Sequence, residues 1–148
     1  MKICLICPPN TYELVGNDPV IIKEQQGVYP PLGILYIAAS MKNAGYDVTV
    51  IDCQAEDIDH NECAKRVAEL KPEVVGLTAM TFTLVDCKLV IQAIRSKISV
   101  PIIVGGPHTA IYPEECFEPK GLNADYVVVG EGEITLDTLA KDIASGKV

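Results

Sequence analysis

Short, almost uniformly apolar runs alternate along this chain with segments in which apolar residues recur every three or four positions. Runs without alternating polar residues are typical of parallel strands that are covered on both faces. They predict five strands, at Ile3–Cys7, Asp47–Ile51, Val74–Thr78, Pro101–Val104 and Tyr126–Val129.

Helical periodicity fills the intervals between these runs. It predicts helices over Gly33–Asn43, Asn61–Leu70, Leu84–Ser96 and Ile134–Ala144, with a short or broken helical turn over Pro113–Phe117. Gly45 is placed to cap the first helix, and Pro72 ends the second. In the third helix we expect an apolar stripe to face the core, made of Val85, Leu89, Ile91, Ala93 and Ile94.

The alternation of strands and helices predicts an α/β fold with right-handed crossovers. We expect a flavodoxin-like (Rossmann-like), doubly wound parallel sheet of five strands in the order 2-1-3-4-5. Residues 1–148 would form one domain, because no internal repeat or linker is visible. Nothing resembling a closing element follows the last helix, so we expect the domain to be a fragment of a longer protein.

Charge and hydropathy exclude several classes of partner. The net charge is −8, from 20 acidic and 12 basic residues, and there is no basic run. Nucleic acids and anionic membranes need clustered Lys and Arg, so neither is expected as a partner. No run approaches the roughly 18 to 20 apolar residues of a membrane span, and the apolar start is too short for a signal peptide. We therefore expect a cytoplasmic protein.

Six cysteines are spread along the chain, and Cys4 and Cys7 form a C-x-x-C pattern. Within a strand, residues three apart point to opposite faces, whereas a redox C-x-x-C opens a helix. Reduced thiols buried in the core are thus favoured over disulfides or a redox pair. The other cysteines are too scattered for a zinc site.

In an open α/β sheet, ligands bind at the carboxyl ends of the strands. The residues that follow the first, third, fourth and fifth strands are therefore candidates: Pro9 and Asn10; Thr78, Ala79, Met80, Thr81 and Phe82; Gly105, Gly106, Pro107, His108 and Thr109; and Gly130, Glu131 and Gly132. Small residues and free helix amides predict a broad groove that suits a large flat ligand with a pendant arm. The connection Pro8–Leu32 is long enough to be a functional loop or lid.

Plainer explanations exist for several of these residues. Glycines are common at strand-to-helix turns, and His108 is more typical of a hydrogen-bonded loop histidine than of a ligand. His60 is expected to be solvated. Glu131 and Glu133 suit a helix N-terminus through the macrodipole, so we assign no catalytic residue.

Motifs of competing families are absent from the sequence. No G-x-G-x-x-G follows the first strand and no P-loop occurs. The paired acids of a response-regulator receiver, the phosphate loop of a flavodoxin and a G-x-S-x-G nucleophile are also missing.

Five segments, in order, resemble those of cobalamin-binding radical S-adenosylmethionine (SAM) proteins: Pro30–Ala39, Ala44–Val48, Pro72–Leu77, Val104–Thr109 and Val129–Glu133. The anaerobic magnesium-protoporphyrin monomethyl ester oxidative cyclases and the cobalamin-dependent radical SAM methyltransferases are most similar. The resemblance implies cobalamin at the strand ends, with Leu32 and the Pro8–Leu32 segment near its lower face. It also implies a parent enzyme that performs methyl transfer or oxidative cyclisation.

Two departures from known patterns refine this implication. The D-x-H-x-x-G motif, whose His ligates cobalt in other cobalamin proteins, is absent. This His is commonly absent from the radical SAM branch, so the resemblance implies base-off binding without a protein imidazole. The C-x-x-x-C-x-x-C motif of a [4Fe–4S] cluster is also absent. The resemblance thus implies a C-terminal radical SAM domain that holds the cluster, SAM and a small-molecule substrate.

Two other functional hypotheses stay open. The chain could be a flavodoxin-like structural or interaction domain that no longer binds cobalamin, or a small-molecule enzyme that uses a flavin or nucleotide sugar at the same strand ends.

Overall fold

Five parallel strands form one sheet in the computed structural model, which describes residues 1–12 and 27–148. The strands are β1 (Lys2–Cys7), β2 (Asp47–Asp52), β3 (Val74–Thr78), β4 (Ile102–Gly105) and β5 (Tyr126–Val127). Their order is β2-β1-β3-β4-β5, and every neighbouring pair is parallel. The predicted fold class and strand order are therefore confirmed. Much of the predicted Pro8–Leu32 connection, residues 13–26, lies outside the described residues.

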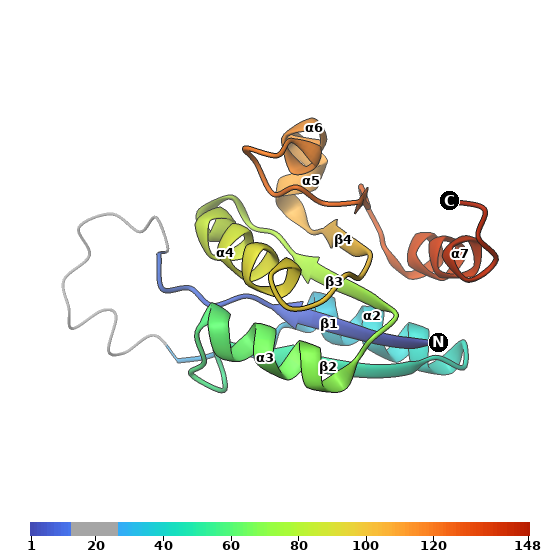
Figure 1. The fold of residues 1–148 in the computed structure, drawn as a ribbon, viewed down its shortest axis with the longest axis horizontal. Helices are drawn as coiled ribbons and strands as arrows, with labels where there is room; N and C mark the ends of the chain where they lie inside the picture. Colours follow the sequence, from blue (N-terminus) through green and yellow to red (C-terminus); the bar gives the residue numbers. More distant parts are fainter. Residues whose placement is uncertain (13–26) are drawn as a thin grey trace.

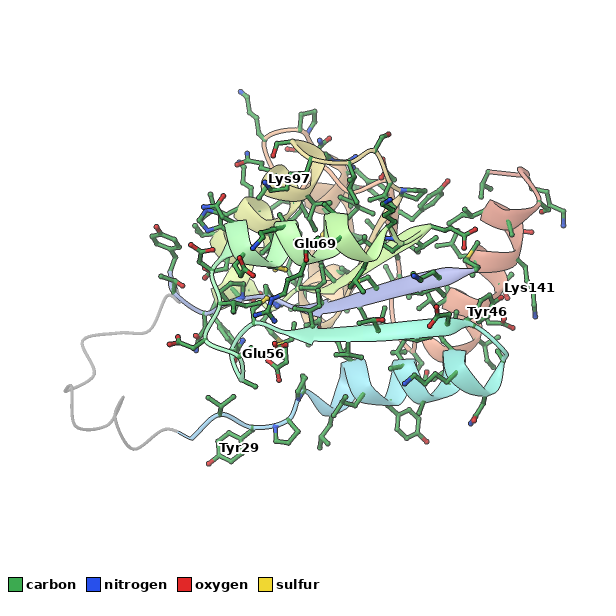
Figure 2. All side chains as sticks on the ribbon, turned by 60° about the horizontal axis from the view of Figure 1, so that its bottom comes forward. Tyr29, Tyr46, Glu56, Glu69, Lys97 and Lys141 are labelled. Atoms are coloured by element: carbon green, nitrogen blue, oxygen red, sulfur yellow. The ribbon has the colours of Figure 1, made fainter. Side chains whose placement is uncertain are left out.

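Helices cover both faces of this sheet (Figure 1). They are α2 (Leu32–Asn43), α3 (His60–Leu70), α4 (Leu84–Arg95), α5 (Pro107–Ile111), α6 (Pro113–Phe117) and α7 (Glu133–Ala144), with a 3₁₀ turn, η1 (Thr81–Thr83). Buried residues of α3 and α4 form one core layer, and those of α2 and α7 form the other. Figure 2 shows α2 and α3 on opposite faces of the sheet. No helix in the described part of the chain is long and apolar enough to span a membrane.

The edge strand β5 is shorter than predicted. It pairs with β4 through Tyr126 and Val127, and the prediction that it reaches Val129 is wrong. The Val128 amide still donates to the Val104 carbonyl, but the chain then turns away, with Gly130 at φ +83° and Val129 exposed. The pairing with β4 ends at Val104 and Val127, although β4 continues to Gly105, which pairs with Thr78 of β3.

The predicted apolar stripe of α4 is also partly wrong. Val85 is 44% exposed, whereas Asp86 and Cys87 are buried together with Ile91 and Ile94. The buried Asp86 carboxylate accepts a hydrogen bond from the backbone amide of Tyr12, in the connection that follows β1. The inward face of α4 therefore includes a hydrogen-bonded acid, which an apolar pattern does not reveal.

All six cysteines are free and buried. Cys4 belongs to the core layer of α3 and α4, and Cys7 to the layer of α2 and α7, as the strand alternation predicts. Burial raises the pKa of the Cys4, Cys7 and Cys87 thiols to about 12. These thiols stay protonated at neutral pH, which confirms the prediction of core thiols.

The turn between α2 and β2 anchors α7 to the amino-terminal edge of the sheet. Gly45 adopts φ +94° and ends α2 as predicted. The Tyr46 hydroxyl then donates to Asp137 at 2.9 Å, and Lys141 donates to the same carboxylate at 2.6 Å (Figure 2). These donors, Lys141 first, hold the pKa of Asp137 below its usual value.

A side-chain cap begins α3 and yields a test of the fold. The Asp59 carboxylate accepts hydrogen bonds from the amides of Asn61 and Glu62 at 2.9 and 2.8 Å. Asp59→Ala should lower the free energy of unfolding by about 1 kcal/mol, because two helix amides lose their acceptor. Urea unfolding followed by circular dichroism measures the change. Asp59→Asn retains a capping oxygen and should lose much less, so equal losses in the two variants would contradict the assignment.

Candidate binding site

The segments that follow β3 and β4 are joined by backbone hydrogen bonds at the carboxyl edge of the sheet. The Ala79 amide donates to the Gly105 carbonyl at 2.7 Å, and the His108 amide donates to the Ala79 carbonyl at 3.1 Å. The fold therefore brings together two groups of predicted site residues, Thr78–Phe82 and Gly105–Thr109.

Gly106 permits this close approach. It adopts φ +106°, and a Cβ there would lie 2.8 Å from both the Ala79 carbonyl oxygen and the Thr78 hydroxyl oxygen. By contrast, a Cβ on Gly105 would make only ordinary contact, 3.8 Å from Val128. The sequence analysis places both glycines in a ligand groove. In the structure Gly106 is also needed within the fold, because a residue without Cβ lets the turn after β4 pack against the turn after β3.

A buried threonine extends the connection to β5. Thr109 is fully buried, and its hydroxyl lies 2.7 Å from the Val128 carbonyl and 2.8 Å from the Gly106 carbonyl, so it donates across the gap between the two segments. Beyond β5, Gly132 begins α7 so close to α2 that a Cβ would lie 2.8 Å from the Ile37 side chain. The predicted group that follows β5, Gly130–Gly132, thus borders α2.

The end of β1 is held by two side chains that the sequence analysis did not single out. Gln54 donates to the Pro8 carbonyl at 3.0 Å, and Asp86, only 2% exposed, accepts from the Tyr12 amide at 3.0 Å. Pro9 is buried and Asn10 is exposed. Asp86 looked like an ordinary acid in a first helical turn, and its one distinguishing signal was its position among apolar residues.

His108 differs from the prediction. It lies in α5 rather than in a loop, and it is 1% exposed. Its Nδ1 is 3.1 Å from the Thr81 hydroxyl, and its Nε2 is 3.7 Å from a carboxylate oxygen of Glu115. The Tyr112 ring stacks at a tilt, with the ring centroids 5.4 Å apart. The helix α5 escaped prediction because its five residues are too few to show an apolar period.

The edge presents apolar side chains to solvent. Met80 is 37% exposed, Phe82 43%, Val129 54% and Leu32, at the start of α2, 75%. Tyr29 precedes α2, and its side chain points away from the molecule (Figure 2). The predicted site residues include no Lys or Arg, so this edge suits a large apolar ligand with neutral polar groups better than a compact phosphate.

Two hollows flank this edge. One of about 510 Å³ lies beside β5 and α7, with Phe117, Tyr126 and Leu139 among its walls. The other, of about 290 Å³, lies between the start of α2 and the end of β2. Neither hollow is lined by the residues predicted after β3 or β4.

Metal ligands do not gather within residues 1–12 and 27–148, where no group of three or more His, Cys, Asp or Glu side chains could hold an ion. His60 is half-exposed at the start of α3 and lies 3.2 Å from the Asn61 side chain. The described residues thus offer a surface for an organic ligand and no multidentate metal centre.

The family of B12 binding domains matches residues 19–140. The chain is 33% identical over 148 residues to an uncharacterized methyltransferase of Pyrococcus horikoshii, covering 99% of this chain and 30% of that protein. It is 29% identical over 127 residues to the anaerobic magnesium-protoporphyrin IX monomethyl ester cyclase of Rubrivivax gelatinosus, covering 84% of this chain and 22% of that protein.

A solved structure has the same fold. The radical SAM methyltransferase TsrM of Kitasatospora setae, with cobalamin and a [4Fe–4S] cluster bound, superposes with a TM-score of 0.79 at 20% identity. The match covers 98% of this chain and 25% of TsrM. The chain thus spans less than a third of the length of each of these three proteins.

Two adjacent glycines test the geometry of the edge. Gly106→Ala should lower the free energy of unfolding by about 1–3 kcal/mol, because it forces an unfavourable φ and a clash with the Ala79 carbonyl. Gly105→Ala, the matched control, should change it by less than about 1 kcal/mol. Denaturant unfolding measures both variants, and a Gly106→Ala protein as stable as the control would contradict the close approach.

Proposed function

Because this chain belongs to the family of B12-binding domains, we propose that it is the cobalamin-binding module of a larger radical SAM enzyme. The observation that carries the proposal is the family match over residues 19–140, together with predicted site residues that include exposed apolar side chains and no Lys or Arg.

We place the cofactor at this edge. The segments Thr78–Phe82 and Gly105–Thr109 would border the corrin and its nucleotide tail, and Gly130–Gly132 would complete the site. Pro9, Asn10 and Leu32 would lie near the lower face. Support comes from the hydrogen bonds that hold the first two segments side by side and from the exposed Met80 and Phe82, which a flat macrocycle would cover.

We propose that cobalt receives no histidine from this domain. The described residues after β1, Pro8–Tyr12, include no imidazole. Of the two histidines of the chain, His108 is buried with its Nδ1 3.1 Å from the Thr81 hydroxyl, and the His60 ring lies 3.2 Å from the Asn61 side chain. The cofactor would therefore bind base-off, without an imidazole from this domain.

The rest of the enzyme would supply the reaction. The relatives are a methyltransferase and a cyclase and are more than three times as long as this chain. We propose a C-terminal radical SAM domain that binds the [4Fe–4S] cluster, SAM and a small-molecule substrate, for methyl transfer or oxidative cyclisation. Cobalamin supplies methyl-carrying or radical chemistry, and this domain binds and orients it. The six free thiols suit a reducing, cytoplasmic location.

A titration with hydroxocobalamin tests the function. We expect saturable binding by calorimetry and a base-off absorption spectrum. A spectrum of imidazole ligation would contradict the proposed axial arrangement. Failure to bind at high micromolar concentration would contradict the function and favour an interaction domain that has lost the cofactor.

The two phenylalanines of the chain form a matched pair for locating the site. Phe82 is 43% exposed at the proposed site, and Phe117 is 49% exposed on α6. Phe82→Ser should weaken cobalamin binding about threefold to tenfold, because covering the exposed part of this side chain contributes on the order of 1 kcal/mol. Phe117→Ser should leave the affinity unchanged. The reverse result would move the site to the hollow beside β5.

A further inference from the structure

His108 is a buried side chain with two differently placed nitrogens. Nδ1 lies 3.1 Å from the hydroxyl oxygen of Thr81, an exposed residue directly beyond β3. Nε2 has no hydrogen-bond partner within the described residues and lies 3.7 Å from the Glu115 carboxylate on α6. The imidazole therefore connects an acid on one side to a hydroxyl at the proposed site on the other.

The position of the imidazole ring is fixed by its surroundings. The His108 amide donates to the Ala79 carbonyl, which holds the start of α5 against the end of β3. The Tyr112 ring stacks against the imidazole. With the ring held, the direction of the hydrogen bond to Thr81 depends only on which nitrogen carries the proton.

Electrostatics selects the proton position in the neutral imidazole. A carboxylate only accepts hydrogen bonds, and its negative charge attracts the N–H to Nε2. Nδ1 then has no proton and accepts one from the Thr81 hydroxyl. A hydroxyl has one proton and two lone pairs, so the Thr81 oxygen presents only lone pairs to the outside.

We propose that His108 is a positioning residue that makes Thr81 a hydrogen-bond acceptor for a carboxamide N–H on the corrin rim of cobalamin. This inference rests on the proposed function. The rim of the corrin carries primary amides, which can donate to Thr81. The phosphate of the nucleotide tail can only accept, so the same arrangement disfavours it at this position.

Thr81 variants test the contact with the ligand. Thr81→Val removes the hydroxyl at nearly constant shape and should weaken hydroxocobalamin binding about threefold to tenfold, the loss typical of one hydrogen bond. Thr81→Ser keeps the hydroxyl and should bind like the wild type. Cobinamide, which lacks the nucleotide tail, should show the same loss with Thr81→Val. A loss confined to cobalamin would place Thr81 at the tail and overturn the inference.

The tautomer of His108 is tested separately, without any ligand. For the neutral imidazole, the nitrogen NMR shifts of the wild type should show the proton on Nε2. Glu115→Ala should populate the Nδ1–H form and weaken cobalamin binding, whereas Glu114→Ala, an exposed neighbour on α6, should do neither. A wild-type proton on Nδ1 would overturn the inference.

The outcomes separate this inference from the proposed function. A wild type that binds neither corrinoid would overturn both. A wild type that binds cobalamin, with Thr81→Val equally tight, would overturn the role of Thr81 and His108 alone.

Discussion

The carboxyl edge of the sheet depends on the contact between the turn after β4 and the backbone at the end of β3. Ala79 uses its amide and its carbonyl to bond this turn, on Gly105 and His108 respectively. Gly106 lies between Gly105 and His108 in the sequence, and only a residue without Cβ fits there. This contact places the first turn of α5 next to the end of β3. His108, in that turn, is buried, and its Nδ1 lies 3.1 Å from the Thr81 hydroxyl. Backbone contacts therefore fix the position of the segment after β4 relative to the segment after β3.

Strand and helix positions could be predicted wherever burial follows a simple period. The central strand β3 has both of its predicted ends, Val74 and Thr78, because it is apolar and has partners on both sides. Prediction was poorer at β5, where the apolar run continues to Val129 although the last backbone bond to β4 is that of the Val128 amide. It was poorer again at α5, because its buried His108 and Thr109 are polar residues that an apolar pattern does not reveal.

For the site, the sequence could predict which segments meet but not how they are held. Parallel topology places strand ends together, so the residues after β3 and β4 were identifiable from their order alone. The bonds that fix them join positions far apart in the chain, such as Tyr12 with Asp86 and Thr81 with His108. Such pairs depend on helix rotation and on short helices, which local patterns do not determine.

The distribution of the cysteines has a practical consequence. Cys7 lies in the layer under α2 and α7, whereas the other five thiols, including Cys63 and Cys116, lie in the layer under α3 and α4. A buried thiol reacts with an alkylating reagent only during a local opening. Mass spectrometry of labelled peptides could therefore time the opening of each side of the sheet separately, with the native sequence and no introduced probe.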